Sequence, residues 1–79
     1  MKERIKFDPQ IFADNLKRLR IERGYSISDI RDYLCLGSVQ SVYKYESGDS
    51  MPTAEGLLAL MDLYGFDVSA FVTFKRKAK

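Results

Sequence analysis

Three glycines divide this chain into short helical segments. Gly24, Gly48 and Gly65 each follow a stretch in which apolar residues recur at helical spacing, and glycine readily adopts the left-handed backbone that ends many helices. Asp8, Ser38 and Thr53, which are residues of the kinds that cap helix starts, precede these three stretches. Ser26 precedes a fourth stretch of the same kind. We therefore expect helices at about residues 9–23, from Ser26 to Leu34, at 39–47 and at 54–64. A domain of 79 residues buries only about 60–65% of its unfolded surface, so these helices must share one core in a compact all-α bundle.

Apolar stripes indicate which faces meet in that core. They are Phe12, Leu16 and Leu19; Ile27, Ile30 and Leu34; and Leu57, Leu60, Met61 and Tyr64. After Gly65, Ser69 is expected to cap a last short helix carrying Phe71 and Val72, with an edge strand over residues 71–74 as the alternative. The bundle thus has four to five short helices. The expected domain organisation is an amino-terminal arm at 1–8, one domain at 9–74 and a basic tail at 75–79.

Composition excludes several kinds of site. Cys35 is the only cysteine and there is no histidine, so the sequence offers neither an internal disulfide nor a zinc cluster nor a Cys-His nucleophile pair. We expect no metal, no cofactor and no enzymatic activity. Apolar runs are too short to span a membrane, and the charged amino terminus lacks the apolar stretch of a secretory signal. A cytoplasmic location follows by default.

Charge alone does not indicate a nucleic-acid partner. Four of the 13 Lys and Arg residues lie in the last five positions, which leaves residues 1–74 with nine cations against 11 anions. The basic tail is therefore an appendage that could add salt-sensitive phosphate contacts or simply aid solubility.

The helix expected at 39–47 has two distinct faces. At 100° per residue, Val42, Tyr45 and Glu46 share one side, which must meet the core. The other side presents hydrogen-bonding groups, namely Gln40, Tyr43, Lys44 and Ser47. Gln can pair with adenine and Lys can donate to guanine or a phosphate, so this face suits the reading of base edges in a major groove. An ordinary solvated helix face is the alternative.

Several separated motifs, in order, resemble the lambda-repressor-like, Cro-type helix-turn-helix family over residues 12–72. They are Asn15 to Arg20 before Gly24, Ser26 to Leu34, Gln40 to Glu46 before Gly48, and Met51-Pro52-Thr53 leading into Leu57 to Leu60. The segment from Val39 to Glu46 looks especially like that of small bacterial regulators with an aromatic-Lys-aromatic-Glu pattern. The resemblance implies a bundle in which the helix at 39–47 enters the major groove of double-stranded DNA.

The resemblance also implies roles for individual residues. Base or nearby phosphate contact falls to Ser38, Val39, Gln40, Ser41, Tyr43 and Lys44. Phosphate contact falls to Ser26, Ile27 and Ser28 at a helix amino terminus and to Ser47. Arg20 and Glu46 match positions that form an ion pair in related repressors, which would join the first helix to the reading helix.

Two of the departures from the family pattern have consequences for the turn and for phosphate binding. Cys35 stands where many members have a turn glycine, so a left-handed backbone there would be strained, unless Gly37 takes that conformation instead. Asp49 stands where a cation would help phosphate binding, so repulsion from DNA is expected there.

Two classes of function remain open. The first is a bacterial or phage-type transcriptional regulator, more often a repressor, that acts by occupying its operator. As a homodimer it would place two reading helices about 34 Å apart on a near-palindromic site. The second is a protein-interaction module of the same fold, antitoxin-like or an adaptor, with weak or no DNA binding.

Overall fold

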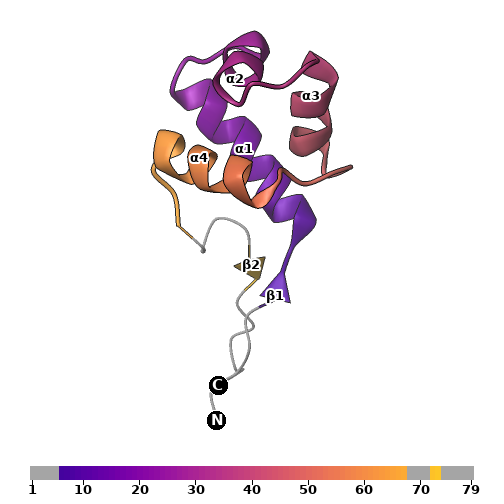
Figure 1. Cartoon of the computed structure of the whole chain (residues 1–79). Helices are drawn as coiled ribbons and strands as arrows, with labels where there is room; N and C mark the ends of the chain where they lie inside the picture. The colour runs from indigo at the N-terminus through magenta and orange to yellow at the C-terminus, as the bar shows by residue number, and fades with distance from the viewer. Residues whose placement is uncertain (1–5, 68–71, 74–79) are drawn as a thin grey trace, which may run out of the picture.

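The computed structural model describes residues 6–67 and 72–73, which form four helices and two short strands. The helices are α1 (Pro9–Glu22), α2 (Ile27–Tyr33), α3 (Val39–Ser47) and α4 (Ala54–Tyr64). The strands are β1 (Lys6–Phe7) and β2 (Val72–Thr73). In Figure 1, α2 and α3 lie at the upper end of the molecule, α4 crosses α1, and the strands lie at the lower end.

Side-chain caps begin all four helices, as the sequence predicted. Asp8 accepts hydrogen bonds from the amides of Gln10 and Ile11, both at 3.1 Å. Ser26 and Asp29 form a reciprocal capping box, in which each side chain accepts from the other residue's amide. The hydroxyls of Ser38 and Thr53 accept from amides in the first turns of α3 and α4. The bounds of α3 and α4 are those expected, and α1 ends one residue earlier.

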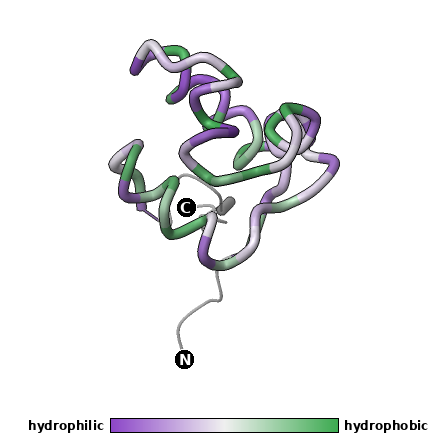
Figure 2. The backbone as a smooth tube through the Cα atoms, turned by 45° about the horizontal axis from the view of Figure 1, so that its top comes forward, coloured by the Kyte–Doolittle hydropathy of each residue, from purple (hydrophilic) through white to green (hydrophobic). Residues whose placement is uncertain are grey.

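The core lies where the apolar faces of the four helices meet. Its five largest fully buried side chains are Phe12, Ile30, Val42, Leu60 and Tyr64. Half-buried residues of the predicted stripes pack around them, including Ile27, Leu34, Tyr45 and Leu57. Hydrophobic and hydrophilic stretches alternate along the helices in Figure 2, as expected where each helix turns one face to a shared core.

The carboxyl-terminal part differs from the helix that we expected there. Val72 lies in β2, so the alternative of a strand is correct at this position, and residues 69–71 lie outside the described residues. β1 and β2 pair antiparallel, with Lys6 opposite Thr73 and Phe7 opposite Val72. β2 also contacts α1. The two strands thus join the first described residues of the chain to the last. Sequence alone could not predict this pairing, because short apolar runs fit a strand and a helix equally well.

Candidate nucleic-acid interface

The recognition surface that we predicted is the exposed side of α3. Val42 is buried on the inner side of this helix, and Tyr45 and Glu46 are half-buried there. Gln40, Tyr43, Lys44 and Ser47 are exposed on the other side. The two faces follow from the helical period, because burying Val42 turns residues two positions away to the opposite side. The capped amino terminus of α3 is also exposed at Ser38.

Three side chains on this surface are available to a partner. The side chains of Gln40, Tyr43 and Lys44 make no hydrogen bond or ion pair with any part of the chain that the structure describes. Tyr43 is 54% exposed, although it is a large aromatic residue. Together they present an amide, a phenol and an ammonium group, which can donate and accept hydrogen bonds at a base edge or a phosphate.

The other candidates for base contact are less accessible. Val39 and Ser41 are half-buried. Ser38 is exposed, but its hydroxyl oxygen already accepts from the Gln40 amide at 3.0 Å. That hydroxyl keeps its hydrogen for donation, so Ser38 can still contact an acceptor.

The residues predicted to contact phosphates are engaged to different degrees. Ser26 is held in the capping box by both its amide and its hydroxyl, and the Ile27 side chain packs against the core. Ser28 is exposed. The Ser47 hydroxyl donates to the Lys44 carbonyl at 3.1 Å and lies 3.4 Å from the Asp49 amide, from which it accepts. Ser28 therefore has the freest hydroxyl of the three serines.

A bidentate ion pair joins α1 to α3. Arg20 Nε donates to Glu46 Oε2 at 2.7 Å and Arg20 Nη2 donates to Glu46 Oε1 at 3.1 Å. The side chains are only 13% and 8% exposed, and Arg20 Nη1 also donates to the Tyr25 carbonyl at 2.9 Å. The hydrogen bond to Glu46 raises the pKa of Arg20 above its usual value. The pair fixes the rotation of α3 about its axis, because planar groups that share two hydrogen bonds have little freedom to turn.

Tyr64 of α4 lies close enough to this pair to feel its charges. Burial raises the pKa of the Tyr64 phenol well above its usual value of 10, and the negative charge of Glu46 adds to that effect. Arg20 opposes it by favouring the phenolate. The inner face of α3 thus meets a neutral phenol on α4 and a cation on α1.

One carboxylate stands beside the exposed face of α3. Asp49 follows Gly48 directly, is exposed, and donates its amide to the Lys44 carbonyl at 3.0 Å. Asp29 carries a second negative charge at the start of α2, with Oδ2 2.8 Å from the Ser26 nitrogen. Both charges disfavour phosphates nearby, and Lys44 is the cation closest to Asp49 in sequence.

The turn between α2 and α3 adopts the strained alternative. Cys35 has a φ of 58°. Among the described residues, it is the only one other than glycine with a positive φ. Gly37 does not take this conformation. The amides of Cys35 and Leu36 donate to the carbonyls of Asp32 and Arg31, which is the Schellman pattern of a helix end with its left-handed residue at Cys35.

Gln10 is a polar neighbour of this surface that the sequence did not reveal. A side chain built on Gly48 would place its Cβ 3.7 Å from Gln10 Oε1, so the start of α1 lies beside the end of α3. Gln10 is exposed and donates to Asp14 at 2.8 Å. No local pattern could have indicated this, because the proximity arises from the crossing of α1 and α3.

Other kinds of site are not found in the described residues. Residues 6–67 and 72–73 hold no group of three or more His, Cys, Asp or Glu side chains that could bind a metal ion. Within the same residues, no helix is long and apolar enough to cross a membrane.

Comparison with known proteins identifies the class to which this fold and surface belong. The model of the helix-turn-helix domain family matches residues 11–71, and the chain belongs to this family. The motif itself is formed by α2, the turn at Cys35 and α3.

Relatives and a solved structure agree with that assignment. The chain is 43% identical over 53 residues to a protein of Saccharolobus solfataricus, and 41% identical over 64 residues to one of Pyrococcus abyssi. Both are named as HTH-type transcriptional regulatory proteins. These matches cover 67% and 81% of this chain but only 17% and 20% of the relatives, so the chain spans about a fifth of their length. The crystal structure of the DNA-binding domain of BldD has a similar fold, with a TM-score of 0.62 and 24% identity, over 82% of this chain and 93% of that one.

Proposed function

We propose that this domain binds double-stranded DNA with α3 in the major groove and acts in transcription regulation. The observation that carries the proposal is the exposed face of α3, where Gln40, Tyr43 and Lys44 are unpaired within the described chain. A helix with its inner side fixed by Val42 and the Arg20–Glu46 pair presents those groups in one orientation. The names of the relatives and of the solved structure support a DNA partner.

Different residues contribute to sequence reading and to general affinity. Gln40 is proposed to read a base, since its amide can pair with adenine in two hydrogen bonds. Lys44 and Tyr43 contact a guanine or a phosphate, while Ser38, Val39 and Ser41 line the end of α3 that enters deepest. Ser26, Ile27, Ser28 and Ser47 lie nearer the DNA backbone. Of these, Ile27 contributes only its amide, because its side chain packs on the core.

The proposal is tested by replacing Gln40. We expect Gln40→Ala to weaken binding to the preferred site by about 1–3 kcal/mol and to leave binding to unrelated DNA nearly unchanged. Fluorescence anisotropy with both duplexes at one salt concentration measures the two effects. An equal loss on both DNAs would show that Gln40 does not read bases.

A repressor that occupies its operator needs no activity beyond this interface. We infer the domain organisation that the sequence suggests, with the binding unit at 9–74, a basic tail at 75–79 and an arm at 1–8 whose Lys6 and Phe7 pair with β2. Two copies on a near-palindromic site would double the contact area, with reading helices about one DNA turn apart. A sedimentation measurement with and without the duplex tests for the homodimer.

The negative charge of the domain favours a second candidate, a protein-interaction module with weak DNA affinity. Residues 1–74 have more anions than cations, and Asp49 is exposed at the end of α3. Phosphate binding depends on cations, so these charges would lower the affinity of the isolated domain for any DNA. This candidate predicts no preferred duplex even at low salt.

A further inference from the structure

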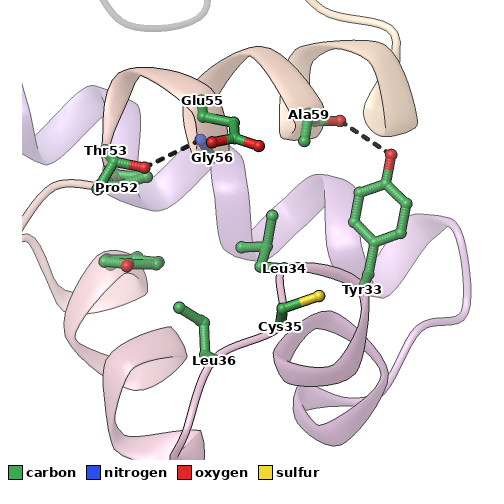
Figure 3. Close-up of a pocket in the computed structure, with 10 residues that line it drawn as sticks. Tyr33, Leu34, Cys35, Leu36, Pro52, Thr53, Glu55, Gly56 and Ala59 are labelled. Atoms are coloured by element: carbon green, nitrogen blue, oxygen red, sulfur yellow. Dashed lines mark hydrogen bonds between the residues drawn. The ribbon is translucent and has the colours of Figure 1, made fainter.

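A cavity of about 320 Å³ lies between the turn of the helix-turn-helix motif and the start of α4. Leu34, Cys35 and Leu36 from the end of α2 and the turn form one wall, and Pro52 and Ala59 lie on the opposite side. Figure 3 shows these residues facing one another across the space, with Tyr33 at one edge. The cavity is on a different side of α3 from Gln40 and Lys44, because Tyr45 of the inner face also lines it.

The size and lining of this cavity suit a small molecule with an apolar body. The cavity is half open to solvent, and sites for small ligands in proteins begin at about 300 Å³. The walls are mostly aliphatic side chains and tyrosine rings. A single aromatic ring with a short side arm therefore fits the space.

The polar groups of the lining determine the charge of that molecule. Glu55 lines the cavity from the first turn of α4, and its carboxylate has no hydrogen bond or ion pair with the described residues. The Tyr33 hydroxyl donates to the Ala59 carbonyl at 3.4 Å, which leaves its oxygen as an acceptor. The hydroxyl of Thr53 already accepts from the Gly56 amide. The one charged group in the lining is therefore the negative carboxylate of Glu55.

From this geometry we propose that the cavity is a binding site for a small organic cation, an arylalkylamine in size and shape. The aromatic ring lies between the turn and Ala59, and the ammonium group faces the Glu55 carboxylate. The amino-terminal dipole of α4 offsets part of the Glu55 charge, so the ion pair adds selectivity for the amine rather than most of the affinity. The site does not depend on DNA binding by α3.

A pair of probes of equal shape tests this proposal. The full chain, labelled with ¹⁵N, is titrated without DNA with 2-phenylethylamine, which is protonated at neutral pH, and with neutral 2-phenylethanol. We expect the amine to bind with a dissociation constant on the order of 1 mM, as suits its few heavy atoms. It should shift the amides of residues 33–36 and 53–59, and it should bind about two- to fivefold more tightly than the alcohol, the contribution of a partly exposed ion pair.

Three variants separate the site from a general charge effect. Glu55→Gln should lower the affinity for the amine to that for the alcohol. The control Asp62→Asn removes an exposed carboxylate that lies on the same helix but outside the lining, and it should change neither affinity. Ala59→Leu fills the cavity from α4 and should abolish binding, with a dispersed spectrum as proof of folding. Cys35 is the only thiol, so its alkylation by iodoacetamide should slow when the amine is bound. Shifts elsewhere, equal affinities for the two probes, or unchanged binding by folded Ala59→Leu would each overturn the proposal.

Discussion

Replacing Cys35 by glycine should stabilise this protein. The left-handed backbone of Cys35 costs a residue with a side chain roughly 1–2 kcal/mol, and glycine avoids this cost. Glycine gains freedom in the unfolded chain, which offsets about 0.5–1 kcal/mol. The thiol is exposed, so little packing is lost. The net expectation is a gain of about 0.5–1 kcal/mol, or a rise of about 2–8 °C in Tm for a domain of this size.

Thermal and urea unfolding followed by circular dichroism, in the presence of a reductant, measures this gain. Two controls isolate the backbone effect. Cys35→Ala keeps the Cβ atom and should stay within about 0.5 kcal/mol of the parent protein. Gly24 has a φ of 78° with no heavy atom within 4 Å of an added Cβ, so Gly24→Ala should lose about 1 kcal/mol through conformation alone. A Cys35→Gly variant no more stable than the parent, alongside a destabilised Gly24→Ala, would show that the backbone of Cys35 stores no such strain.

Three further predictions concern charge. Asp49→Lys adds a cation beside α3 and should steepen the dependence of the logarithm of the DNA-binding constant on log salt by about 0.9 for any duplex. The control variant Asp62→Lys should leave this slope unchanged. Equal slopes for the two variants would show that Asp49 lies outside the interface. Glu46→Gln should cost about 1.5–3 kcal/mol of folding stability, and Arg20→Met with Glu46→Leu should cost less than Glu46→Gln, because no charge is left buried alone. The raised pKa of Tyr64 means that the folded state keeps a proton that the unfolded state releases above about pH 10, so stability present below pH 10 is lost as pH rises. Tyr64→Phe should make that alkaline loss shallower by about 1.4 kcal/mol per pH unit, and an unchanged slope would show that Tyr64 does not contribute.

Local signals in the sequence predicted most of the helices. Asp8, Ser26, Ser38 and Thr53 cap helix starts through bonds to amides within three residues, and such bonds depend only on nearby sequence. The helical period likewise distinguished the buried Val42 from its exposed neighbours. These features were predictable because both causes act within one helix.

Features that depend on the approach of distant segments were not predictable in the same way. The pairing of Phe7 with Val72 joins residues 65 positions apart, and the local pattern at Val72 fitted a helix as well as a strand. The position of Gln10 beside Gly48 depends on how α1 crosses α3. The cavity beside Cys35 similarly needs the placement of α4 against the turn. The sequence also left open whether Cys35 or Gly37 takes the left-handed conformation, since both lie in the turn.

The interface residues are a different case. The sequence indicated which side of α3 is exposed, but exposure does not reveal what the side chains bind. The Ser47 hydroxyl, for example, donates to the Lys44 carbonyl. Sequence alone does not distinguish a serine that bonds to the end of its own helix from one that contacts a phosphate.

Selection of bound duplexes from a random library by the purified protein tests most directly whether α3 reads a DNA sequence. We expect enrichment of a defined site at low salt, and loss of that enrichment in Gln40→Ala. A near-palindrome would indicate a dimer on the DNA, and a single short half-site a monomer. A pool that stays random under conditions where the protein is folded would show that α3 does not read DNA and would favour the protein-interaction module.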